Sequence, residues 1–100
     1  AFTYIGHNII RNSGDNGILL KNSFLGWIND NDIEGAGDNG IEARNAFGLK
    51  ITGNTIAESD DNGIRVDNAF GVKVRDNSVS DSGYHGIYVS DSNGVKIEDN

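Results

Sequence analysis

The stretch NTIAESDDNGIRVDNAFGVKVRD, residues 54–76, decides the fold because it is one copy of a unit that recurs every 23 residues. The pair Gly-Ile marks the same place in each copy, at Gly17-Ile18, Gly40-Ile41, Gly63-Ile64 and Gly86-Ile87. An asparagine column keeps the same spacing, at Asn8, Asn31, Asn54, Asn77 and Asn100. A unit of this length cannot bury its own apolar face, so the copies are expected to stack on one another.

Apolar residues within one unit alternate with polar ones, as in Ile64-Arg65-Val66 and Val72-Lys73-Val74. This spacing of two predicts β-strands, and no stretch has helical spacing. Three short apolar stretches per unit, each ended by Gly, Asn, Asp or Ser, predict three short strands and three turns per coil. The segment Asp61-Asn62-Gly63 and its equivalents are expected to be turns, with positions that tolerate a positive φ. The predicted fold is an all-β parallel β-helix of about four coils, with strands about 4.8 Å apart.

Each repeated position of such a fold becomes a ladder along the axis. Isoleucine ladders are expected inside, and asparagine ladders are expected to link coils through their amides. A further column consists of Asn22, Asn45, Asn68 and, as a departure that can only accept hydrogen bonds, Asp91. Phe24, Phe47 and Phe70 are expected to stack, with Asn93 ending the stack. Gly26 replaces an apolar residue of the other copies, which predicts a one-residue bulge that turns Leu25 or Trp27 into the core.

The consensus unit, N-x-I-x-x-S-G-D-N-G-I-x-V-x-N-A-F-G-V-K-I, resembles the repeat of pectin-lyase-like proteins. It is most similar to the NosD-like and alginate-epimerase-like right-handed β-helices, and the resemblance covers essentially the whole chain. It implies a right-handed single-stranded β-helix over residues 1–100, expected to be a fragment of a longer solenoid. Members of the family include polysaccharide lyases, hydrolases, alginate C5-epimerases and non-catalytic surface or periplasmic proteins, so an extracellular or periplasmic location is expected.

A leucine-rich repeat is the rival fold. The segment 49–56, LKITGNTI, fits the pattern L-x-L-x-x-N-x-L, and 23 residues is a permitted period for such repeats. The other half of each unit disfavours this fold, because it carries a second strand signal, Gly-Ile-x-Val-x-Asn, where a leucine-rich repeat has a helix or loop.

Composition excludes several classes of function. The formal net charge of −7 argues against a nucleic-acid partner, since phosphate binding needs a stripe of Lys and Arg. The chain has no cysteine and therefore no disulfide framework or thiolate metal site. It also has no apolar run near 18 residues, so no membrane-spanning segment is predicted.

The fourth copy departs most from the others, because Tyr84-His85 replaces Asp-Asn before Gly86-Ile87. Tyr84, His85 and Tyr88, with Arg65 one coil away, are similar to the groups of an alginate lyase or epimerase. The resemblance implies that a basic residue neutralises the uronate carboxylate while Tyr or His moves the C5 proton. The chain has no proline, so it lacks the Tyr-Gly-Phe-Asp-Pro-His motif of the alginate epimerases. Aromatic stacking and surface decoration that avoids like-charge neighbours account for these side chains equally well.

The acidic turns form a second candidate site. Asp15, Asp38 and Asp61 occupy one column, and Asp60 lies beside the last. Hard cations such as Ca²⁺ bind oxygen ligands of this kind, so a calcium site is one interpretation. The chain lacks the calcium nonapeptide G-G-x-G-x-D, and Asp-Asn-Gly is also ordinary turn chemistry.

Neither end of the sequence resembles a capping element. Uncapped coils present unpaired strand edges, so the chain is expected either to continue in a longer β-helix or to stack end to end with other copies. The sequence as a whole predicts a structural or carbohydrate-facing module without catalysis of its own. Its expected partner is an acidic polysaccharide. The alternative is a segment of an alginate-type C5-epimerase or lyase.

Overall fold

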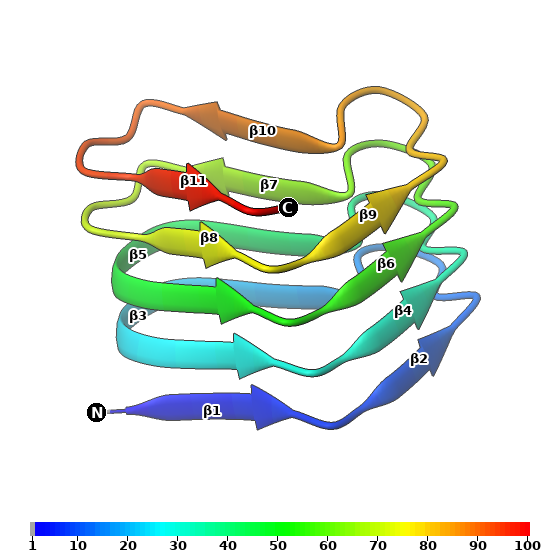
Figure 1. The fold of residues 1–100 in the computed structure, drawn as a ribbon, viewed down its shortest axis with the longest axis horizontal. Helices are drawn as coiled ribbons and strands as arrows, with labels where there is room; N and C mark the ends of the chain where they lie inside the picture. The colour runs from blue at the N-terminus through cyan, green and yellow to red at the C-terminus, as the bar shows by residue number, and fades with distance from the viewer. Residues whose placement is uncertain (1) are drawn as a thin grey trace.

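The computed structural model describes residues 2–100 as a stack of parallel coils (Figure 1). Every regular element in this range is a β-strand. The strands are β1 (Thr3–Gly6), β2 (Ile9–Arg11), β3 (Ile18–Asn29), β4 (Asp32–Glu34), β5 (Ile41–Thr52), β6 (Thr55–Ala57), β7 (Ile64–Asp67), β8 (Lys73–Arg75), β9 (Ser78–Ser80), β10 (Ile87–Ser90) and β11 (Lys96–Glu98).

The strands form two sheets in which all pairing is parallel. The larger sheet has seven strands, ordered β1-β3-β5-β7-β10, with β8 pairing both β5 and β11; the smaller has the order β2-β4-β6-β9. Partners are always one repeat apart, as in Ile41 with Ile64 and Ile56 with Val79. The predicted stacking and register are therefore confirmed. In β3 and β5 the second and third predicted strands of the unit are joined through a bend, whereas the next coil keeps them as the separate strands β7 and β8.

The interior is filled by the predicted apolar columns. Ile41, Ile51, Ile64 and Val66 have no exposed surface, and their column neighbours in the middle coils are also buried. Burying each such side chain stabilises the fold by about 1.5–3 kcal/mol. Coverage decreases in the last coil, where Ile97 is 48% exposed.

Asparagine side chains link the coils at the corner between the two sheets. The backbone N–H and the Nδ2 of Asn31 both donate to Oδ1 of Asn54, each over 2.9 Å. The same Nδ2 donates its second hydrogen to the carbonyl of Ile5 at 3.0 Å. The amide is therefore satisfied although Asn31 is only 2% exposed. This confirms the predicted asparagine ladder.

The repeated Gly-Ile pair has a steric cause. A Cβ at Gly40 would lie 2.4 Å from Cγ2 of Ile56 and 2.7 Å from the carbonyl oxygen of Gly63. Only glycine lets the coils approach this closely. The residues of positive φ lie elsewhere, for example at Asn22 and Gly48, so the Asp-Asn-Gly segments do not use the positive φ that their residues tolerate.

The predicted bulge near Gly26 is wrong. Gly26 pairs with Leu49 and Trp27 with Lys50, so the register of β3 on β5 runs through without an extra residue. Leu25 and Trp27 remain 45% and 38% exposed. The space beside Gly26 is filled from the next coil, because Cδ1 of Leu49 lies 3.1 Å from where a Cβ of residue 26 would be.

Candidate functional site

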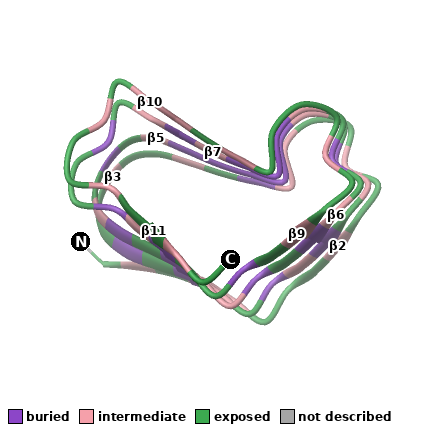
Figure 2. Cartoon of the chain, turned by 45° about the horizontal axis from the view of Figure 1, so that its top comes forward, coloured by how far each residue is buried: buried purple, intermediate pink, exposed green. Residues whose placement is uncertain are grey.

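One cleft brings together the side chains that the fourth copy and its neighbour contribute. A cavity of about 270 Å³ is lined by Asp61, Asn62, Arg65, Tyr84, His85 and Tyr88. Arg65 projects from β7 and Tyr88 from β10, while the other four residues lie in the connections that precede these strands. Figure 2 shows these connections as stacked loops that project beside the strands β7 and β10.

Strand alternation and the repeat position the residues of this cleft. Tyr88 lies directly opposite Arg65 in the sheet, because both occupy the same outward position of consecutive coils. His85 stands where the other copies have an asparagine, and its backbone N–H still donates to Oδ1 of Asn62 at 3.1 Å. Its imidazole stacks on Tyr88, with ring centroids 5.3 Å apart and planes 11° from parallel. Tyr84 is 79% exposed at the rim.

Arg65 carries a positive charge that no neighbouring carboxylate neutralises. Its guanidinium carbon lies 5.6 Å from the centroid of the Tyr88 ring, a cation–π distance. Its Nε is buried and has no hydrogen-bond partner. Within residues 2–100 no carboxylate oxygen lies within 4.0 Å of it, whereas each of the other arginines is paired: Arg11 with Asp32, Arg44 with Glu42 and Arg75 with Asp76.

The carboxylate opposite Arg65 is bound elsewhere. Glu42 is only 4% exposed, although the sequence places it on the outward face. One of its oxygens accepts from Nη2 and Nε of Arg44 at 2.6 and 3.0 Å, and the other accepts from Nδ2 of Asn39 at 3.1 Å. Because Glu42 binds these donors and lies beyond 4.0 Å from the nitrogens of Arg65, Arg65 remains available to an anionic ligand.

The acidic turns lie beside this cleft. Burial raises the pKa of the Asp38 carboxyl, and a side-chain hydrogen bond with Asp61 raises it further. The negative charges of Asp61 and Asp15 act in the same direction. In the described range 2–100, no three or more His, Asp or Glu side chains are grouped as a metal site would require. The calcium interpretation of Asp15, Asp38, Asp60 and Asp61 stays a prediction.

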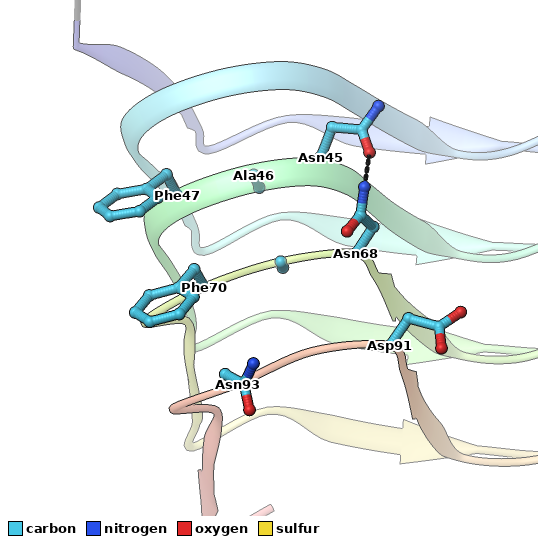
Figure 3. A pocket seen from close by; sticks show the side chains of 8 residues that line it. Asn45, Ala46, Phe47, Asn68, Phe70, Asp91 and Asn93 are labelled. Carbon is cyan, nitrogen blue, oxygen red and sulfur yellow. Dashed lines mark hydrogen bonds between the residues drawn. The ribbon is translucent and has the colours of Figure 1, made fainter.

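A second cavity, of about 280 Å³, lies at the bend of the larger sheet (Figure 3). Asn45, Asn68 and Asp91 form one side, Phe47, Phe70 and Asn93 form the other, and Ala46 and Ala69 lie between them. The predicted phenylalanine stack is present, with centroids of Phe47 and Phe70 5.4 Å apart and planes 7° from parallel. In the sequence, Asp91 ends the asparagine column and Asn93 ends the phenylalanine column. A cavity between these two columns was not predicted.

The chain matches one family of known proteins over nearly its whole length. The family model described as "Right handed beta helix region" matches residues 2–100. No match was found among curated proteins. No helix in the part of the chain that the structure describes is long and apolar enough to cross a membrane.

Among solved structures, the chain is similar to the enzymatically active domain of tailspike protein 2 of bacteriophage CBA120, with a TM-score of 0.72 and 17% identity. The match covers 97% of this chain and 18% of that one, so the chain spans less than a fifth of the tailspike structure. At this identity the likeness concerns the fold alone. Since the family model spans every described residue, the chain belongs to the right-handed β-helix family.

Proposed function

We propose that the chain is a carbohydrate-facing β-helix module that binds an acidic glycan in the cleft of Arg65, Tyr84, His85 and Tyr88. The observation that carries the proposal is the unpaired guanidinium of Arg65 beside an exposed aromatic surface, in a chain whose net charge is −7. Such a module suits a protein that meets polysaccharide outside the cytoplasm.

The chemistry of the cleft matches an acidic sugar in two ways. A guanidinium binds a carboxylate through charge-assisted hydrogen bonds, and Arg65 has no carboxylate within 4.0 Å among residues 2–100. The ring of Tyr84, which is 79% exposed, presents an amphipathic face that suits the C–H surface of a sugar ring, and the hydroxyl groups of Tyr84 and Tyr88 suit its hydroxyls. The carboxylate of Asp61, which lines the cleft, adds an acceptor for sugar hydroxyls.

The test is a titration with an oligouronate, followed by the imidazole proton signals in NMR spectra. The chain has two histidines, so His85 reports on the cleft and His7 serves as an internal reference. We expect the His85 signals to shift and saturate, and the variant Arg65→Gln to weaken binding about tenfold or more. The matched control is Arg75→Gln, which removes an exposed arginine that is already paired with Asp76. The proposal is contradicted if the cleft binds a neutral oligosaccharide with the same affinity. It is also contradicted if Arg65→Gln leaves the affinity for the oligouronate unchanged.

A second proposal for the same cleft is an alginate-type C5-epimerase or lyase activity, supported by the shared location of Arg65, Tyr84, His85 and Tyr88. Arg65 would neutralise the uronate carboxylate and make the C5 proton more acidic. His85 or a tyrosine would take that proton. Return of a proton to the opposite face of C5 inverts the sugar. Alternatively, the C5–H electron pair forms a C4–C5 double bond while the C4–O bond breaks and the leaving oxygen takes a proton.

The two proposals are separated by product analysis. A lyase produces unsaturated ends that absorb ultraviolet light, and an epimerase changes the proportion of C5 epimers in NMR spectra. If either activity is present, His85→Gln and Tyr88→Phe are expected to lower kcat more than they raise KM. If the chain binds the oligouronate but forms neither product, with or without divalent cations, the enzyme proposal is contradicted and the binding proposal stands.

A further inference from the structure

Three lysines lie directly opposite one another on the outer surface of the larger sheet. Lys50 of β5 pairs with Lys73 of β8, and Lys73 pairs with Lys96 of β11. They occupy the outward position of the strand that follows the bend, between core residues such as Leu49 and Ile51. Backbone spacing in a parallel sheet places successive members about 4.8 Å apart.

This arrangement is unfavourable for the fold itself. Like charges directly opposite one another destabilise a sheet. Lys21 and Arg44 also lie opposite one another, but the next residue of that column is Asp67, whereas the lysine column holds three positive charges in succession. Lys96 has Glu98 at 3.8 Å, but Lys50 and Lys73 have no carboxylate within 4.0 Å among residues 2–100. A chain with a net charge of −7 thus carries a local row of positive charge.

Aromatic side chains continue the same column at its other end. Trp27 pairs with Lys50, and Tyr4 pairs with Trp27. The two rings meet edge to face with centroids 5.6 Å apart, and both stay exposed, at 47% for Tyr4 and 38% for Trp27. The indole Nε1 donates to Oγ1 of Thr52 at 2.6 Å, which holds the tryptophan in one orientation. A fixed aromatic face therefore lies beside the first lysine of the row.

We propose that this column, Tyr4, Trp27, Lys50, Lys73 and Lys96, is a second binding face for a linear acidic glycan lying along the axis of the β-helix. A sugar ring packs on Trp27, and the acidic groups of the following units contact Lys50 and Lys73. The face is distinct from the Arg65 cleft, because the bend in β3 and β5 separates the two outer surfaces (Figure 2). The inference concerns the same class of ligand as the proposed function but does not need the cleft.

The distribution of rings favours a glycan over a single-stranded nucleic acid. Nucleic-acid strands bind on a series of aromatic side chains that stack successive bases. This column has one aromatic pair at one end, Tyr4 and Trp27, and the three members that follow it are lysines. The remaining contacts are isolated charges at a regular spacing, which suit a polymer with one acidic group per non-aromatic unit.

Trp27 is the single tryptophan of the chain, so its fluorescence reports directly on this face. We expect titration with an oligouronate to change the emission of Trp27 with saturation, and the affinity to fall as salt is raised. The double variant Lys50→Gln/Lys73→Gln is expected to lower that affinity about tenfold or more. It should also melt at the same or a higher temperature, because like-charge repulsion is removed.

Two control variants separate this face from the Arg65 cleft and from a general loss of positive charge. Arg65→Gln should leave the Trp27 response intact even if the cleft proposal fails. Lys21→Gln removes an exposed lysine on the other outer surface and should also leave that response intact. The proposal is overturned if the emission does not respond, if the folded double variant binds as the parent does, or if a neutral oligosaccharide of equal length gives the same response. Tighter binding of single-stranded DNA than of the oligouronate would also overturn it.

Discussion

Asn54 and Asn77 are joined by two hydrogen bonds across neighbouring coils: the backbone N–H and the Nδ2 of Asn54 both donate to Oδ1 of Asn77, over 3.0 and 2.9 Å. Both side chains are buried, and Nδ2 of Asn54 also donates to the carbonyl of Ile28. An aspartate could not supply the donors, and a serine could not span both contacts. The ladder therefore depends on the amide at every coil.

The substitution Asn54→Ala is expected to lower the free energy of unfolding by about 3 kcal/mol, because it leaves buried donors of Asn31 and the carbonyl of Ile28 without partners. Urea denaturation measures this loss. Asn8→Ala is the matched control at the exposed end of the ladder, where the loss should be below about 1 kcal/mol. Equal losses at both positions would show that burial of the ladder does not matter.

The close approach of coils at the Gly-Ile pair predicts a steric effect. Gly40→Ala is expected to destabilise the fold by about 2 kcal/mol or more, because the new methyl group overlaps Ile56 and the backbone of Gly63. Gly14→Ala is its control, since a Cβ there has no atom within 4 Å. The control should leave the free energy of unfolding unchanged or raise it by about 0.5 kcal/mol. A tolerated Gly40→Ala would mean that the spacing of the coils adjusts.

The raised pKa of Asp38 predicts a pH-dependent gain of stability on removing its charge. A carboxyl whose pKa is higher in the folded state than in the unfolded state binds its proton more tightly when folded. Its ionised form therefore opposes folding at pH values above both pKa values, and the effect disappears below the unfolded value of about 3.8. Asp38→Asn should thus raise the melting temperature at pH 7 and leave it unchanged near pH 2.5. Asp60→Asn, an exposed carboxylate nearby, is the control and should show a smaller gain. A gain of the same size at both pH values would show that the charge of Asp38 is not the cause.

The buried carboxylate of Glu42 is neutralised by the guanidinium of Arg44. The variant Arg44→Gln is expected to destabilise the chain more than Arg75→Gln does, because Glu42 is buried whereas the carboxylates beside Arg75 are more exposed. Adding Glu42→Leu to Arg44→Gln should recover stability, since the equivalent position of the first copy is Leu19. Thermal melts of the two single variants and the double variant measure the coupling. Additive effects would show that the pair does not act as a unit.

The cavity beside Phe70 predicts a stabilising substitution. Position 93 pairs with Phe70 in the regular register, so a phenylalanine there can extend the stack of Phe24, Phe47 and Phe70 (Figure 3). Asn93→Phe is expected to raise the free energy of unfolding by about 1 kcal/mol. Asn93→Ser is the control and should bring no gain. Destabilisation by the phenylalanine would indicate that the last coil cannot place the ring in line with the stack.

The period of 23 residues was sufficient to predict the fold, the parallel register, the isoleucine core, the asparagine ladders and the phenylalanine stack. In a β-helix each residue lies on its equivalent in the next coil, so residues in one column of the sequence are neighbours in space. Tyr84, His85, Tyr88 and Arg65 share a cleft for the same reason: they occupy adjacent columns and consecutive coils.

The tertiary structure alone decided which partner each outward or turn-adjacent side chain takes. Glu42 lies opposite Arg65 but binds Arg44 and Asn39, and Leu49 fills the space beside Gly26 in place of a bulge. Several donors or apolar groups lie within reach of each such side chain. The choice among them depends on rotamers and on the exact approach of neighbouring coils, which a column of residue types does not contain. The residue types that repeat every 23 positions thus determined the backbone and the core. The choice of each surface side chain among nearby partners determined which charges stay unpaired and where cavities form.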